Sequence, residues 1–185
     1  MKCLILAAGY ATRLYPLTKD MPKPLLEVSG KTILEHILIK VESVVEIDGI
    51  YIITNDRFYK HFNEWISEYK SSKKIIVIND GTRSNETRLG AVADIQYAVD
   101  KESIKDELMV LAGDNLFDFE LIDFVKYYRI KRSDCITTHE INDAERLKRT
   151  GIIEVDNSMR VVSFEEKPKK PKSNLAAPPF YIYSE

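Results

Sequence analysis

The sequence has few of the residues that mark common redox and hydrolytic sites. It contains two cysteines, Cys3 and Cys135, which form no CxxC pair. Both lie in apolar segments typical of strands, which favours reduced core thiols over a disulfide or a metal site. The three histidines are far apart, and no HExxH, GxSxG or other nucleophile motif is present. Metal-hydrolase chemistry and nucleophilic catalysis are therefore poorly supported.

The chain also lacks a strong charge and a long apolar segment. Its net charge of −2 gives no reason to expect nucleic acid as a partner. The apolar stretch at residues 3–8 is too short for a signal peptide or a membrane span, so we expect a cytoplasmic protein with no membrane partner. A length of 185 residues and a hydrophobic content of 44% fit one globular domain over residues 1–185.

Apolar segments typical of strands alternate with helical patterns through most of the chain, which predicts a parallel α/β sheet. Later strand-like segments have no helices between them, so we expect a mixed sheet or a small antiparallel layer. Asp156-Asn157 is the expected hairpin turn there. The expected strands are 2–7, 50–54, 74–79, 107–112, 134–140, 151–155, 160–165 and 179–183, and the expected helices are 32–45, 57–69, 88–99 and 120–131.

The first strand opens into a loop of small residues, Ala7-Ala8-Gly9-Tyr10-Ala11-Thr12, which leads to Arg13. Such a strand end leaves backbone N–H groups uncovered, and these donors attract an anion. Arg13 adds a fork of donors for phosphate oxygens, and Lys23, between two prolines, adds a point charge at a fixed place. The pattern predicts a triphosphate site. The alternative is an ordinary turn with two solvated cations.

Two commoner phosphate loops do not fit. The dinucleotide fingerprint GxGxxG requires glycine at positions that Ala11 and Leu14 occupy. Residues 30–32, Gly-Lys-Thr, look like the end of a P-loop, but the glycine required five residues earlier is Leu25. We therefore interpret residues 30–32 as a turn and a helix start, and a nicotinamide-dependent oxidoreductase is disfavoured.

A carboxylate follows the fully apolar strand expected at 107–112. Ligands of open α/β sheets bind beyond the carboxyl ends of the strands, and Asp114 is placed there to hold Mg²⁺ against phosphates. A Gly-Asp-Asn step alone is more often a turn. A phosphate loop on the same sheet edge, two or more strands away, favours the metal.

A second charged segment ends the strand expected at 160–165. Glu166 and Lys167 place a carboxylate beside an ammonium, a combination that can bind a phosphorylated, polar acceptor. The alternative is an exposed ion pair of little energetic value.

The chain resembles the sugar-phosphate nucleotidyltransferases, which include glucose-1-phosphate thymidylyl- and uridylyltransferases, in the residues LAAGYATRLYPLT and MPKPLLEVSGKTILEH. The resemblance implies a three-layer α/β/α Rossmann-like nucleotide-diphospho-sugar transferase fold with a mixed, mostly parallel sheet. The family usually has glycine where this chain has Ala11, so phosphate affinity falls if that position needs a positive φ. Because the resemblance stops at Glu185, we expect a missing C-terminal portion that could carry a second metal carboxylate.

The resemblance also implies a role for each candidate residue. Implied catalytic residues are Arg13, Lys23 and Lys167, and the implied metal ligand is Asp114. Implied nucleotide-binding residues are Leu6, Ala7, Ala8, Gly9, Tyr10, Ala11, Thr12, Arg13, Lys23, Asn85 and Gly90, and implied sugar-phosphate-binding residues are Asn115, Gly151, Glu166 and Lys167. Without the resemblance, Asn85 or Thr87 would be an ordinary helix cap.

The implied reaction joins a nucleoside triphosphate, with a pyrimidine favoured, to a sugar 1-phosphate and releases pyrophosphate, with Mg²⁺ as cofactor. The attacking phosphate oxygen is already ionised, so in-line displacement at the α-phosphorus needs no protein nucleophile. A non-sugar acceptor such as phosphocholine, a non-catalytic nucleotide-binding module and a homo-oligomer all stay open. The base is not predicted, because many relatives carry Gln where this chain has the shorter Asn85.

Overall fold

The computed structural model describes all 185 residues, which form two compact units. The first unit comprises Met1–Asp134 with Ile182–Glu185, and the second comprises Cys135–Tyr181. The expectation of one domain over residues 1–185 stays a prediction.

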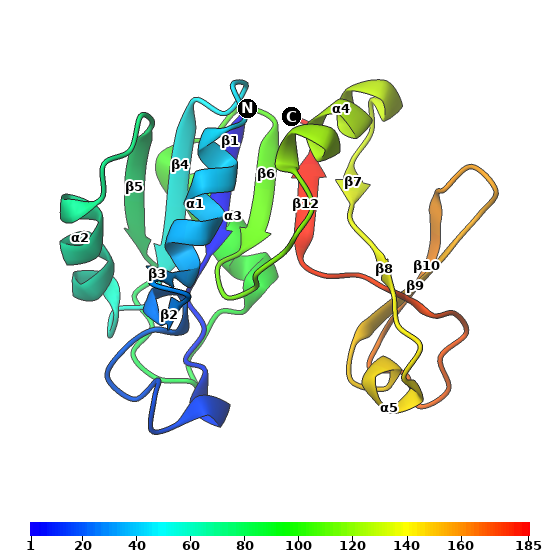
Figure 1. Ribbon diagram of the computed structural model, residues 1–185, viewed down its shortest axis with the longest axis horizontal. Helices are drawn as coiled ribbons and strands as arrows, with labels where there is room; N and C mark the ends of the chain where they lie inside the picture. Colours follow the sequence, from blue (N-terminus) through cyan, green and yellow to red (C-terminus); the bar gives the residue numbers. More distant parts are fainter. The chain divides into compact units, whose positions relative to one another are not determined.

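The first unit is built on a sheet in which four neighbouring strands run parallel (Figure 1). These strands are β1 (Lys2–Leu6), β4 (Gly49–Thr54), β5 (Lys74–Asn79) and β6 (Leu108–Ala112). The full strand order is β5-β4-β1-β6-β12-β7, in which β7 (Cys135–Ile136) and the first two residues of β12 (Phe180–Tyr183) fall in the second unit. The arrow of β12 points opposite to the others, so the sheet is mixed and mostly parallel, as predicted. In the central strand β1, Leu6 lies opposite Ile53 of β4 and Ala112 of β6.

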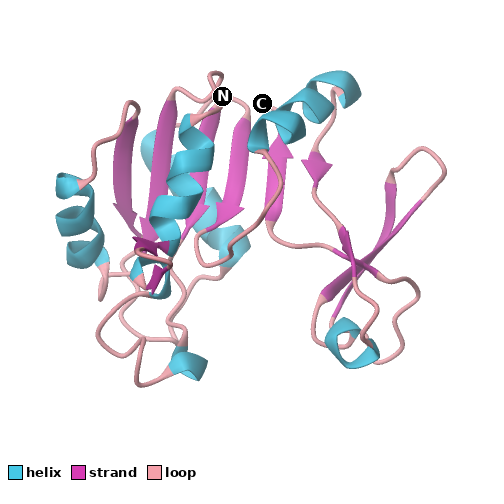
Figure 2. Ribbon diagram, viewed as in Figure 1, coloured by secondary structure: helices cyan, strands magenta, loops and turns pink.

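Helices cover both faces of this sheet and give the predicted α/β/α layers (Figure 2). They are α1 (Ile33–Glu42), α2 (Tyr59–Glu68), α3 (Ala91–Glu102) and α4 (Leu121–Lys131). Helix α1 buries residues at helical spacing, whereas every residue of β6 is buried, as in a parallel strand covered on both faces. Thr32 caps α1, because its Oγ1 accepts the N–H of Glu35 at 3.1 Å.

Short elements complete the loops of the first unit. They are the 3₁₀ turns η1 (Thr12–Leu14) and η2 (Lys23–Leu25) and the hairpin strands β2 (Glu27–Val28) and β3 (Lys31–Thr32). Gly30 has a φ of 79° in the turn of this hairpin. The predicted turn and helix start at residues 30–32 are confirmed, and the hairpin is an addition to them.

The second unit contains a small antiparallel sheet with the order β10-β9-β11-β8. Its elements are β8 (His139–Glu140), α5 (Ala144–Leu147), β9 (Gly151–Val155), β10 (Val161–Glu166) and β11 (Leu175–Ala176). The turn between β9 and β10 is the predicted one at Asp156-Asn157. Asp156 Oδ1 accepts the N–H groups of Ser158 and Arg160 at 2.8 and 2.9 Å. The antiparallel layer expected late in the chain is thus confirmed.

Two expected elements were wrong in detail. Residues 134–140 form no single strand, because β7 and β8 belong to different sheets. The helix expected over 88–99 begins at Ala91, after Gly90 in a left-handed backbone with φ 89°, so neither Asn85 nor Thr87 caps it. A side-chain cap acts only from the position directly before the helix, which here is a glycine.

The two cysteines, which the sequence predicted to be reduced core thiols, are buried. Cys3 and Cys135 are buried thiols, as predicted, and burial raises the pKa of the Cys3 thiol. No helix combines the length and the apolar character that a membrane span requires.

Candidate functional site

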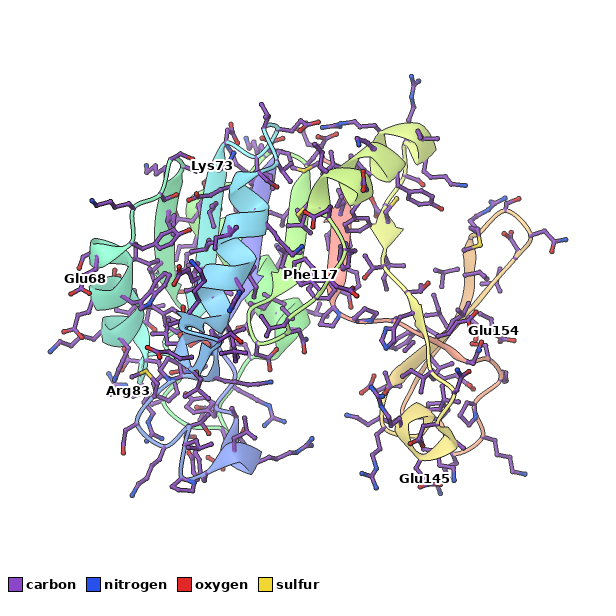
Figure 3. The ribbon with its side chains drawn as sticks, viewed as in Figure 1. Glu68, Lys73, Arg83, Phe117, Glu145 and Glu154 are labelled. Carbon is purple, nitrogen blue, oxygen red and sulfur yellow. The ribbon has the colours of Figure 1, made fainter.

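The carboxyl ends of β1, β4, β5 and β6 lie at one end of the first unit's sheet, and the loops that follow them gather there (Figure 1). Arg83 comes from the loop after β5 and Phe117 from the loop after β6 (Figure 3). This edge is where ligands of open α/β sheets bind.

The loop after β1 presents an unbroken series of unused backbone donors. Ala7 still donates its N–H to Ile53 O at 2.8 Å, but the N–H groups of residues 8–13 donate to no acceptor of the protein. A Cβ placed on Gly9 would meet no atom within 4 Å, so the space beside the loop is open. Consecutive free N–H groups at the start of a helical turn attract an anion.

The carbonyl groups of the same loop are held by residues at the end of β4. Asn55 is fully buried, and its Nδ2 donates to Ala8 O at 2.9 Å while its Oδ1 accepts the N–H of Phe58 at 3.1 Å. Thr54 Oγ1 donates to Ala7 O at 3.4 Å. Neither residue was among the predicted site residues, although a polar pair at the end of a buried strand is a signal for them.

Ala11 adopts the left-handed conformation, with φ 46° and ψ 37°. Its carbonyl oxygen accepts the N–H of Leu14 at 2.9 Å and the hydroxyl of buried Thr18 at 2.8 Å. The position therefore needs a positive φ, which is the condition under which alanine in place of glycine is unfavourable.

Lys23, in η2, and Asp114, after β6, form an ion pair with Nζ and Oδ2 2.9 Å apart. Gly113, directly before Asp114, lies against the end of β1. Its N–H donates to Leu6 O at 2.8 Å, and a Cβ at this position would also lie 2.8 Å from that oxygen, so only glycine allows this close contact. The expected separation of two or more strands between Asp114 and the phosphate loop is wrong. Strands β4 and β5, which lie between β1 and β6 in the sequence, pair on the other side of β1.

A metal at Asp114 would need ligands from outside the protein. No group of three or more His, Cys, Asp or Glu side chains could hold a metal ion. Mg²⁺ is commonly bound by one or two carboxylates together with phosphate oxygens and water, so a lone Asp114 suits only a metal shared with a bound phosphate. Asn115 follows it in the same loop, partly buried.

Arg13 is exposed and makes no ion pair, which leaves its guanidinium available to a ligand. Tyr10 differs, because its side chain is buried and its hydroxyl lies 3.3 Å from Thr82 Oγ1. Burial raises the pKa of Tyr10. Only the backbone of Tyr10 can therefore face a ligand in the open space beside Gly9.

In the polar segment 80–90, Arg88 Nη1 lies 2.6 Å from Asn85 Oδ1. A guanidinium can only donate, so the amide oxygen of Asn85 is occupied and its NH₂ group remains as donor. Gly90, at the end of this segment, directly precedes α3.

The remaining predicted residues belong to the second unit. Gly151 begins β9 opposite Glu166 of β10, and Lys167 Nζ lies 2.9 Å from Glu166 Oε1. A Cβ on Gly151 would lie 2.9 Å from the Phe164 ring and 3.2 Å from Glu166 Oε2. The structure therefore brings Gly151, Glu166 and Lys167 together. The ion pair is exposed on both sides, so it adds little stability.

Ala11→Gly is expected to raise the free energy of unfolding by about 1 kcal/mol. Glycine removes a left-handed penalty of about 1–2 kcal/mol, and its greater backbone entropy in the unfolded chain offsets about 0.5–1 kcal/mol of that gain. Urea denaturation measures the change. Ala93→Gly, at an exposed position of α3, is the matched control and should lower stability by about 1 kcal/mol. Equal losses in both variants would contradict the strain at Ala11.

Asn55→Ala is expected to lower the free energy of unfolding by about 3 kcal/mol, because it leaves the carbonyl of Ala8 and the N–H of Phe58 unpaired in the interior. The same denaturation experiment measures it. Asn63→Ala, which removes an exposed amide of α2, should change stability by less than about 0.5 kcal/mol. Similar effects of the two variants would show that Asn55 does not fix the loop.

Comparisons with curated proteins extend along the whole chain. GlmU of Methanocaldococcus jannaschii, named as a bifunctional protein, is 34% identical over 176 residues, which cover 95% of this chain and 38% of the relative. The UTP–glucose-1-phosphate uridylyltransferase AglF of Haloferax volcanii is 30% identical over 184 residues, which cover 100% of this chain and 72% of the relative. This chain thus spans well under half the length of the GlmU relatives.

Solved structures show the same fold. A Bacillus anthracis protein assigned as a glucose-1-phosphate thymidylyltransferase, in complex with sucrose, matches with a TM-score of 0.83 and 26% identity over 100% of this chain and 71% of that chain. A UDP-glucose pyrophosphorylase complexed with UDP-glucose has a TM-score of 0.81 at 18% identity, over 99% of this chain and 75% of that chain. The sequence itself matches the family described as nucleotidyl transferase over residues 2–185, and the chain belongs to that family.

Proposed function

We propose that this chain transfers a nucleotidyl group from a nucleoside triphosphate to a sugar 1-phosphate and releases pyrophosphate. The series of free N–H groups at residues 8–13, beside the Lys23–Asp114 pair, is the observation that carries the proposal. The name of AglF, which specifies UTP and glucose 1-phosphate, supports this substrate class and a pyrimidine base.

The loop after β1 would hold the triphosphate. Its backbone donors have no acceptor in the protein, the space beside Gly9 is open, and Arg13 has no competing partner. A guanidinium offers paired donors that match phosphate oxygens, so Arg13 would bind the pyrophosphate part that departs. The loop is held from behind by Asn55 and Thr54, so little ordering is required when the ligand binds.

The reaction needs positioning and charge neutralisation rather than an acid or base. An ionised oxygen of the sugar phosphate forms a bond to the α-phosphorus, while the bond from that phosphorus to the bridging oxygen breaks and pyrophosphate leaves with the electron pair. No proton has to move. Lys23 would offset the repulsion between the two polyanions, and we assign the same role to Lys167, with Glu166 and Gly151 as sugar contacts.

Asp114 would be the protein ligand of Mg²⁺. When bound, the ion would neutralise charge on the phosphates. In the free protein Asp114 is paired with Lys23, so Lys23 would exchange a carboxylate for a phosphate as partner. The base would meet the NH₂ group of Asn85, which is a donor only, and the backbone at Gly90.

Calorimetry with dTTP, UTP, CTP, GTP, ATP and NAD, each with and without Mg²⁺, tests the proposal. We expect one preferred triphosphate, whose affinity rises with Mg²⁺. Binding is the suitable readout, because the chain spans only part of several relatives. A preference for NAD, or binding of none of the triphosphates, would overturn the proposal. Binding without pyrophosphate release over a panel of sugar phosphates and phosphocholine would indicate a non-catalytic module.

Two variants locate the site. Arg13→Ala is expected to weaken triphosphate binding about 10-fold, and Asp114→Ala to remove the Mg²⁺ dependence and to lower turnover about 100-fold or more. Both side chains are partly or fully exposed, so thermal stability should stay near that of the unmodified protein. Asp123→Ala removes an exposed carboxylate of α4 and should change neither property. Near-normal turnover of Asp114→Ala would refute the metal assignment.

A further inference from the structure

Two carboxylates are buried beside the candidate nucleotide site, and neither is part of the reaction described above. Asp80, directly after β5, is 8% exposed, and Asp94, in the first turn of α3, is 6% exposed. Asp80 Oδ2 and Asp94 Oδ1 are both buried and have no hydrogen-bond partner. Buried acceptors without a donor are costly, so this pair calls for a physical cause.

One proton would satisfy both atoms. Asp80 acts on Asp94 through its charge and through side-chain hydrogen bonding, so a proton on Asp94 would be donated to Asp80. Burial, and then the charge of Asp80, raise the pKa of Asp94 to about 6. Asp80 is the charged group that acts on Asp94, and no basic side chain offsets it there. A carboxylate pair of this kind shares one proton rather than ionising twice.

The position of the pair gives the proton a structural consequence. Asp80 and Asp94 lie at the two ends of the segment 81–93, which contains Asn85 and Gly90. Attraction between them closes this segment at its base, whereas two ionised carboxylates would repel each other and open it.

A chain of hydrogen bonds continues from the pair to the loop after β1. Thr82 donates its N–H and its hydroxyl to Asp80 Oδ1 at 2.7 and 2.8 Å. The hydroxyl hydrogen of Thr82 is therefore used, and Tyr10 must be the donor in its 3.3 Å contact with Thr82 Oγ1. Arg57 and Asp56 also act on the Tyr10 hydroxyl, with opposite signs.

We propose that Asp80 and Asp94 are positioning residues that share one proton, and that this proton holds the segment 81–93 and Tyr10 in the arrangement that binds a nucleotide. The inference rests on the proposed function, because its ligand is a nucleoside triphosphate. The proton is bound more tightly in the folded protein than in the unfolded chain. Its contribution to stability is therefore complete at low pH and is lost as the pH rises through about 6.

Thermal unfolding of the full chain between pH 5 and pH 8 tests the shared proton without any ligand. Asp94→Asn places a neutral amide donor opposite Asp80 at every pH. The unmodified protein should lose about 5 °C in Tm relative to this variant as the pH rises. Asp100→Asn, which removes an exposed carboxylate from the same helix, is the matched control and should follow the unmodified protein. If the Tm values of Asp94→Asn and of the unmodified protein change with pH in the same way, the proposal is overturned.

Calorimetry with UTP and Mg²⁺ at pH 6 and pH 8 tests the positioning role. Affinity should fall about 5-fold with rising pH in the unmodified protein and in Asp100→Asn, and should stay constant in Asp94→Asn. The Asp94→Asn measurement accounts for the titration of the nucleotide itself, because this variant lacks the shared proton. Tyr10→Phe removes only the connecting hydroxyl. In this variant Tm should depend on pH as in the unmodified protein, but the affinity for UTP should change less between pH 6 and pH 8.

The results separate the two proposals. A pH-dependent Tm that Asp94→Asn abolishes, combined with equal UTP affinities at both pH values in all variants, would leave a shared proton with no positioning role and so overturn the inference. If UTP does not bind at either pH, the triphosphate that the panel prefers replaces UTP in the same measurements, and equal affinities at both pH values would again overturn the inference. If the whole nucleotide panel also fails to bind, the proposed function fails with it, whatever the Tm measurements show.

Discussion

The hydrogen bond between the buried amide of Asn55 and the carbonyl of Ala8 decides which side of the first loop faces outward. Thr54 and Asn55 hold the carbonyls of Ala7 and Ala8, whereas the N–H groups that follow have no internal partner and the space beside Gly9 is open. Arg13, Lys23 and Asp114 then supply charged side chains around this loop. A loop that was free to turn over would present oxygen atoms to a phosphate and would repel it.

The ion pair of Lys23 and Asp114 balances the charge at the candidate site in the free protein. The ammonium and the carboxylate are each partly shielded from water, so neither is left alone in a region of reduced dielectric. A phosphate with its metal ion would offer each group a new partner of the opposite sign. In the proposed reaction, this exchange would leave neither Lys23 nor Asp114 without a partner of opposite charge.

The long, periodic elements were predictable from the sequence, and so were the turn at Asp156-Asn157 and the cluster around Glu166. Strands of two residues and a helix of four carry no measurable period, so β2, β3, β11 and α5 were not predictable. The contact of Lys23 with Asp114 depends on the order of strands in the sheet, which local patterns do not encode. The burial of Asp80 and Asp94 was not predicted either, because a polar segment that becomes buried has the same composition as an exposed loop.

Two glycines that look equivalent in the sequence are constrained by different things. Gly113 cannot accept a side chain without displacing the backbone of β1, so the fold itself requires glycine there. Nothing in the protein opposes a side chain at Gly9, whose surroundings are empty. In a library of variants selected for folding alone, position 9 would tolerate many residues and position 113 almost none. If the proposed ligand binds beside Gly9, selection for binding would restrict both positions, and the difference between the two selections would outline the volume that the ligand fills.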